Sequence, residues 1–149
     1  MTRNFFLAEL VIIYLFFTSI VFSGNFNYHD KGKILFDKKQ FDKSKFLFEK
    51  DIVFNPKNEK SYLYLAKIFN QNENEQSEEL NLNSVLILNP KNDEALYMMI
   101  LLKMKQYDYA QAKQLIKKFD LVCKSFCSKK AEIEKKFSKL VPDDAKDNN

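Results

Sequence analysis

The chain has very little of what flexible loops and catalytic sites are usually built from. Its 149 residues include two glycines, three prolines, one histidine and no tryptophan. Because few residues interrupt helices, a largely helical protein is expected. Gly24 and Gly32 cannot form a glycine-rich phosphate loop, and a catalytic triad would depend on His29 alone. The sequence therefore predicts a protein that is not an enzyme and uses no cofactor.

Arginine is almost missing as well. Arg3 is the only one, and the net charge of +4 comes from lysines that are mixed with Asp and Glu along the chain. Proteins that read nucleic acids depend on arginine for bidentate contacts with bases and phosphates. We therefore expect no nucleic-acid partner.

The N-terminal segment is the most apolar part of the chain. A cationic start with Arg3 precedes an apolar run that ends in the small residues Ser23 and Gly24, which is typical of a cleaved signal. We expect a signal peptide at residues 1–23 and export to the periplasm or cell envelope. The run from Phe5 to Phe22 also approaches the length of a membrane span. The alternative is therefore an uncleaved helix that anchors the protein in the inner membrane, which is the only contact with a membrane that we expect.

Cys123 and Cys127 are the only cysteines. An even number of cysteines in an exported chain favours a disulfide between them, although two buried thiols are the alternative. A zinc site that also uses His29 would lack a fourth ligand, and His29 lies near the other end of the chain. We therefore expect no metal.

Two similar stretches reveal an internal repeat. "NPKNEKSYLY" covers residues 55–64 and "NPKNDEALYM" covers residues 89–98, so the two copies are 34 residues apart. Around them, apolar residues recur at helical spacing in pairs of short segments that polar breaks separate. Pro56 and Pro90 end two of these units because proline cannot continue a helix. The sequence predicts a repeated helix-turn-helix unit.

This pattern resembles the tetratricopeptide repeat (TPR) family, whose unit is a helix-turn-helix of the same length. Laid on the family pattern, the repeats are residues 25–58, 59–92 and 93–126. The residues that match are Tyr28, Gly32, Leu35, Phe41, Ser44, Phe48 and Pro56 in the first repeat, Tyr62, Leu65, Ala66, Phe69, Leu82 and Pro90 in the second, and Leu96, Met99, Tyr109 and Ala112 in the third. The resemblance implies an all-α fold in which three repeats form a short right-handed solenoid.

Several residues depart from the family pattern. Lys31 and Asp51 stand where the family has an aliphatic and a small residue, and Glu78 and Ile100 replace small residues of the second and third repeats. We expect the second helix pair to be splayed or its turn lengthened, and the third pair to pack less closely. The acidic residues between positions 73 and 79 are expected to lie in a solvated turn.

The segment at residues 127–141 is predicted to be a capping helix. Its apolar stripe consists of Ile133, Phe137, Leu140 and Val141, with Lys and Glu on the opposite side. Such a helix would cover the apolar helix that begins the third repeat and end the solenoid. Residues 142–149 are expected to be a disordered tail.

The resemblance also implies a binding surface. In the family, the first helix of each repeat lines a concave groove that binds peptides or partner proteins. Carried over by position, the groove residues are Phe26, His29, Lys33, Phe36, Lys60, Leu63, Lys67, Asn70, Glu94, Tyr97, Leu101 and Met104. This mixture of apolar and basic residues suits an apolar anchor flanked by acidic groups. The family's clamp for a C-terminal carboxylate is not reproduced.

Two functions follow from these features. The first is a non-catalytic protein-protein interaction module of the cell envelope that binds a peptide or partner protein through the groove. The alternative is a structural subunit of an envelope complex, held at the membrane by its N-terminal helix. Because three repeats are about the smallest stable stack, pairing with a second copy stays open.

Overall fold

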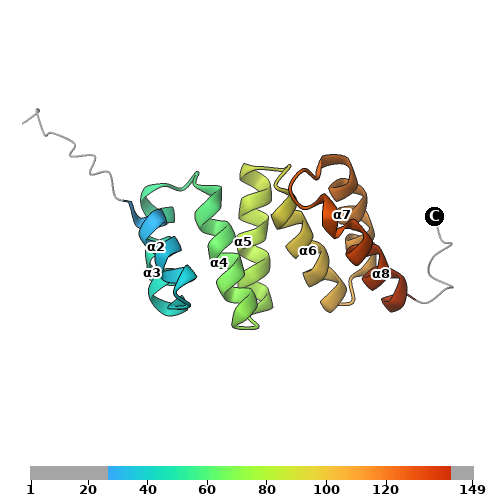
Figure 1. The fold of residues 1–149 in the computed structure, drawn as a ribbon, viewed down its shortest axis with the longest axis horizontal. Helices are drawn as coiled ribbons and strands as arrows, with labels where there is room; N and C mark the ends of the chain where they lie inside the picture. Colours follow the sequence, from blue (N-terminus) through green and yellow to red (C-terminus); the bar gives the residue numbers. More distant parts are fainter. Residues whose placement is uncertain (1–26, 142–149) are drawn as a thin grey trace, which may run out of the picture.

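The structure is a computed structural model that describes residues 27–141. The predicted signal or anchor segment, Phe26 and the predicted tail lie outside these residues. The described part contains seven α-helices and a short 3-10 turn, with no strand, so the predicted all-α class is confirmed (Figure 1). The elements are α2 (Tyr28–Asp37), α3 (Phe41–Phe54), α4 (Glu59–Gln71), α5 (Glu75–Leu88), α6 (Asp93–Lys105), α7 (Tyr109–Val122), η1 (Cys127–Lys129) and α8 (Lys130–Leu140).

The helices form three pairs in a row, followed by a cap (Figure 1). We call α2, α4 and α6 the opening helices and α3, α5 and α7 the closing helices. Each closing helix packs on its own opening helix, and α3 and α5 also pack on the opening helix of the next pair. This arrangement confirms the predicted solenoid of three helix-turn-helix units with a C-terminal capping helix. Among the described helices, none has the length and apolar character needed to cross a bilayer.

The three pairs use the same short turn. Its middle residue is left-handed in every case: Lys39, Glu73 and Tyr107 have φ angles of 58°, 55° and 60°. These residues are 34 positions apart, so the turn repeats with the sequence period. The turn of the second pair is as short as the others, and the predicted lengthening is wrong. The prediction of a solvated acidic turn is correct for Glu73, which is exposed in the turn, but wrong for the later residues, because α5 begins at Glu75 and Glu78 is buried within it.

In the first two pairs, a small residue of the opening helix is matched by a large residue of the closing helix. Gly32 faces Phe48, and a Cβ at Gly32 would come within 2.9 Å of the Phe48 ring. At the equivalent places the second pair has Ala66 and Leu82, which share one core cluster. The third pair has Ile100 where glycine stands in the first, and Ile100 is fully buried. The third pair therefore accommodates the larger residue, and α6 and α7 are in less extensive contact than the helices of the other two pairs, in line with the looser packing expected there.

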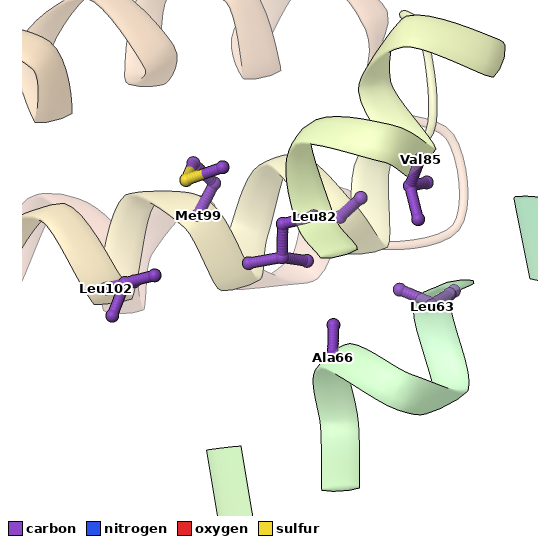
Figure 2. Packing of buried hydrophobic residues seen from close by; sticks show 7 residues of the cluster. Leu63, Ala66, Leu82, Val85, Met99 and Leu102 are labelled. Carbon is purple, nitrogen blue, oxygen red and sulfur yellow. The ribbon is translucent and has the colours of Figure 1, made fainter. Parts of the chain in front are cut away.

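The central core lies where the second and third pairs meet. Leu82 and Val85 of α5 point toward side chains of α4 and α6 (Figure 2). Its fully or nearly buried members are Leu63, Ala66, Leu82, Val85, Ala95, Met99 and Leu102. Burying apolar side chains contributes roughly 1.5 to 3 kcal/mol each to folding. This cluster is what joins α5 to both neighbouring opening helices.

The cap closes the far end of the stack. Ile133 is 1 % exposed and packs into a cluster with Ile100, Met104 and Phe119. Val141 is also buried. Leu140 was predicted to belong to the same apolar stripe, but it is exposed, so this part of the prediction is wrong. The cap gives the apolar helix α6 a buried environment on the side where no fourth pair follows.

Candidate functional site

A cavity of about 290 Å³ opens between the opening helices α4 and α6. It extends to the end of α2 on one side and to the loop after α7 on the other. Most of its wall is apolar or aromatic, with charged and amide groups at a few places. The lining residues are Phe36, Lys67, Asn70, Gln71, Glu78, Glu94, Tyr97, Met98, Leu101 and Phe126.

The cavity brings together six of the twelve predicted groove residues, from three helices. They are Phe36 of α2, Lys67 and Asn70 of α4, and Glu94, Tyr97 and Leu101 of α6. These residues are up to 65 positions apart in the chain, and only the stacking of consecutive repeats places them side by side.

The remaining predicted groove residues do not line this cavity. Leu63 is 8 % exposed and belongs to the central core, so its assignment to the groove is wrong: the helix turns it toward α5. His29 lies in a polar cluster between the first two pairs. Lys60 is exposed, and Lys33 is exposed and paired with Asp37 of its own helix at 3.7 Å. Phe26 lies outside the described residues.

Met104, also placed on the groove face by position, is a core residue. It is 3 % exposed and packs in the cluster that joins α6, α7 and the cap. Met104 also lines a second cavity, of about 330 Å³, which lies between α6 and the cap and shares Leu101 with the first.

Four residues of the cavity were not predicted: Gln71, Glu78, Met98 and Phe126. Gln71 and Met98 lie one position along the helix from predicted residues, so helical spacing could have included them. The sequence offered a reason to single out Glu78, because it departs from the family pattern. Nothing in the sequence singled out Phe126, because it comes from the loop after α7 and only the tertiary structure brings it to α6.

A network of backbone hydrogen bonds holds that loop against α6. Oδ2 of Asp93 accepts hydrogen bonds from the backbone N–H groups of Lys124, Ser125 and Phe126, at 2.7, 2.6 and 2.9 Å. Burial favours the neutral acid, but the three N–H donors outweigh it and lower the pKa of Asp93. The network places the Phe126 ring 5.8 Å from the ring of Tyr97.

A disulfide closes the same loop. Cys123 and Cys127, the predicted pair, are bonded to each other. Among the described residues, no three His, Cys, Asp or Glu side chains are grouped so that they could hold a metal ion. The loop thus has two constraints, a covalent one and the hydrogen bonds to α6.

Tyr97 links the cavity wall to the cap. Its hydroxyl donates a hydrogen bond to Glu132 of α8 at 3.0 Å. Glu132 also accepts from Lys136 and Lys129, and these donors lower its pKa to about 2. The carboxylate therefore stays charged at every ordinary pH and holds Tyr97 in place.

The charged groups of the cavity differ in their partners. Lys67 forms an ion pair with Glu94 at 2.7 Å, and its Nζ lies 5.0 Å from the centre of the Tyr64 ring. Glu78 is 3 % exposed, and both its carboxylate oxygens accept from the amide of Asn70, at 3.0 and 3.1 Å. Lys67 is therefore neutralised inside the cavity, whereas Glu78 is bound to a neutral donor.

The polar cluster between the first two pairs contains His, Ser and Asp but not in a catalytic order. The Ser61 hydroxyl donates to Asp51 at 2.6 Å, and its oxygen lies 2.9 Å from Nδ1 of His29. In a catalytic triad the histidine lies between the other two and takes the serine proton. Here the serine lies between them, and its hydroxyl donates a hydrogen bond to Asp51 and not to the histidine. Burial lowers the pKa of His29, against the opposing effect of Asp51.

Comparison with known proteins agrees with the fold. No family model matches the sequence, and a search of curated proteins finds no match. Among solved structures, the chain is similar to the Sgt2 TPR domain from Aspergillus fumigatus, with a TM-score of 0.63 and 15% sequence identity. The similarity covers 82% of this chain and 88% of that one. Together with the repeat of 34 residues, it shows that this chain has the fold of a tetratricopeptide repeat domain.

Proposed function

We propose that this protein is a non-catalytic interaction module that binds a segment of a partner protein in the cavity between α4 and α6. One observation carries the proposal: residues from three successive opening helices, far apart in sequence, converge on one apolar cavity with a few polar groups. Apolar walls provide affinity for an inserted side chain, and a small number of polar groups select its chemistry.

The hydrogen-bonding pattern supports a role without catalysis. The only histidine is held in the His29–Ser61–Asp51 cluster, outside the cavity and in an order unsuited to activating serine. Within the cavity, Lys67 and Glu94 neutralise each other, which leaves no lysine there as a free nucleophile or base.

A photocrosslinking experiment tests the proposed groove. A benzoylphenylalanine is placed at Met98, which lines the cavity, or at Ile87, which is 79% exposed on the closing helix α5. We expect a crosslinked partner from position 98 in intact cells, lost when Leu101→Arg fills the cavity. Position 87 serves as the matched control. Adducts from position 87 alone, or from neither position, would refute the groove.

We also propose that the chain is exported and acts in the cell envelope. The signal-like pattern of residues 1–23 and the pairing of Cys123 with Cys127 support this location, because disulfides persist in oxidising compartments. Mass spectrometry of the N-terminus of the mature protein tests it. We expect a chain that begins at Gly24. An intact N-terminus found in the membrane fraction would instead support the anchored structural subunit.

A further inference from the structure

One charged side chain of the cavity has no counter-ion among residues 27–141. The charged residues on its lining are Lys67, Glu94 and Glu78, of which the first two form an ion pair. Within residues 27–141, Glu78 forms no ion pair. Lys105, whose charge acts on Glu78, is itself paired with Glu75 at 2.9 Å. The described part of the chain therefore leaves one negative charge of the cavity without direct compensation.

The burial of Glu78 makes this charge costly. Its side chain is almost completely buried, and one neutral amide, that of Asn70, serves both of its oxygens. A buried carboxylate normally needs a cation or several hydrogen-bond donors. Burial accordingly raises the pKa of Glu78, although the Asn70 amide and Lys105 oppose the shift. A cation that entered the cavity would supply the missing compensation.

The walls of the cavity suit a cation on a long apolar stem. The rings of Phe36, Tyr97 and Phe126 reach the cavity from three different elements, together with the side chains of Met98 and Leu101. Aromatic faces attract cations, and the methylene groups of lysine and arginine pack well on apolar surfaces. With a volume of about 290 Å³, the cavity is at the lower limit of ligand pockets and fits one long side chain.

We propose that the cavity binds a lysine or arginine side chain of the partner segment, with Glu78 as its counter-ion. This inference rests on the proposed function and names the chemistry that the groove selects. The sequence suggested that the partner carries acidic groups beside an apolar anchor, whereas the structure favours a basic group. The reason is that two of the groove lysines on which that expectation rested already have an acidic partner in this chain. Lys67 is bound to Glu94 in the cavity, and Lys33 is bound to Asp37 outside it.

Selection from a random peptide library tests the inference without knowledge of the natural partner. Linear dodecapeptides displayed on phage are selected on the purified chain. The most enriched peptide is then measured by fluorescence polarisation against the wild type and Glu78→Gln. A second peptide, in which norleucine replaces the lysine or arginine, is measured in parallel.

The variants are matched in structure. Glu78→Gln keeps one oxygen that accepts from Asn70 and removes the charge and the second acceptor, so it is expected to fold. Glu79→Gln is the control, because Glu79 is the next residue of α5 but binds Lys103 at 2.6 Å and does not line the cavity. Thermal unfolding of both variants verifies that any change in binding does not come from a loss of structure.

We expect enrichment of lysine or arginine at one peptide position. Glu78→Gln should weaken binding of that peptide by about thirtyfold, the lower end of what a truncated buried charge pair costs. Glu79→Gln should leave binding unchanged, and the norleucine peptide should bind equally to wild type and Glu78→Gln. Enriched peptides without basic residues, or a change of less than about twofold in Glu78→Gln, would overturn this inference and leave the groove intact. Failure to enrich any peptide would overturn the groove and this inference together.

Discussion

The two joints between consecutive helix pairs use the same repeat positions in different ways. At the first joint, Asp51 is 1 % exposed and accepts hydrogen bonds from Ser61, Asn58 and Asn55. Thirty-four residues later, the positions of Asp51 and Ser61 are occupied by Val85 and Ala95, both fully buried in the central core. At these positions the first joint has hydrogen bonds and the second has apolar contacts, so we call them the polar joint and the apolar joint. Elsewhere the contrast is incomplete, because Phe48, Leu65 and Ile68 form an apolar cluster across the polar joint, and Lys103 pairs with Glu79 across the apolar joint.

The same contrast extends to the opening helices. His29 lies beside Ser61 at the first joint and contacts the rings of Phe48 and Tyr64. Its equivalent at the second joint is Leu63, a core residue. At these three positions, the first joint has polar side chains that contact one another, and the second joint has apolar side chains that contact one another. The repeat thus fixes the backbone geometry of a joint and leaves its chemistry free, provided that the positions change together.

The largest loss of stability is expected from placing a charge in the apolar joint. Val85→Asp would bury a carboxylate among Leu63, Ala95 and Leu102, and the buried members of that cluster have no side-chain donor to receive it. We expect a loss of more than about 4 kcal/mol in the free energy of unfolding, measured by urea denaturation. Val85→Ala, which removes apolar contacts only, is the control and should cost less. Equal losses in the two variants would show that the second joint tolerates charge and would weaken the comparison.

A somewhat smaller loss of stability is expected when the acceptor of the polar joint is removed. Asp51→Ala removes the acceptor of three side-chain hydrogen bonds and leaves the buried hydroxyl of Ser61 without its acceptor. The free energy of unfolding should fall by about 3 kcal/mol, the cost of breaking a buried polar network at one partner. A loss below about 1 kcal/mol, which is typical of a surface substitution, would contradict the role assigned to this network.

Transplanting the second joint into the first sharpens the comparison further. The triple variant Asp51→Val, Ser61→Ala, His29→Leu copies the residues of the apolar joint. Asn55 and Asn58 are not buried, so water can replace their lost partner. We expect the triple variant to unfold within about 1 kcal/mol of the wild type, whereas Asp51→Val alone should be much less stable. If the single and triple variants were equally unstable, the positions would not act as a set.

These joints also show what the sequence predicted and what it did not. The period, the prolines and the helical spacing predicted the helix pairs and the cap, because they depend on local backbone preferences. They did not predict the partners of Asp51 or Glu78. The sequence marks each as an acid at a position for a small residue, but their donors, Ser61 and Asn70, lie on the preceding or following helix. Which donors surround a buried acid depends on how the helices pack.

The same reason explains the outcome for the cavity. Six of the twelve predicted groove residues line it, because stacking brings equivalent positions of successive opening helices close together. Leu63 and Met104 follow the same register but are buried, since α5 and the cap cover them. Phe126 joins the site from a loop whose path depends on the hydrogen bonds to Asp93. The position of a residue in the repeat gives the side of the helix on which it lies. Whether its side chain is exposed depends on which other helices pack against that side.

The smallest effect is a pH dependence that only the polar joint should show. Burial lowers the pKa of His29 below its ordinary value of 6.5, while Asp51 and Asp30 oppose the shift and Lys60 and Lys33 add to it. Above about pH 6.5 His29 is neutral in both states, and its contribution to stability is complete. Below that pH the unfolded chain binds a proton that the folded chain resists, so the free energy of unfolding falls until the pH reaches the lowered pKa.

His29→Gln isolates this contribution, because glutamine can still donate a hydrogen bond to Ser61 but does not titrate in this range. Urea denaturation of both proteins between about pH 7.5 and about pH 5 should give a steeper loss on acidification for the wild type. Glu78, whose raised pKa acts in the opposite direction, is present in both proteins and cancels in the difference. Parallel curves would mean that the first joint accepts a charged His29, with Asp51 as its counter-ion. At low pH the polar joint would then contain an ion pair between His29 and Asp51. It would differ from the apolar joint in charge as well as in hydrogen bonding.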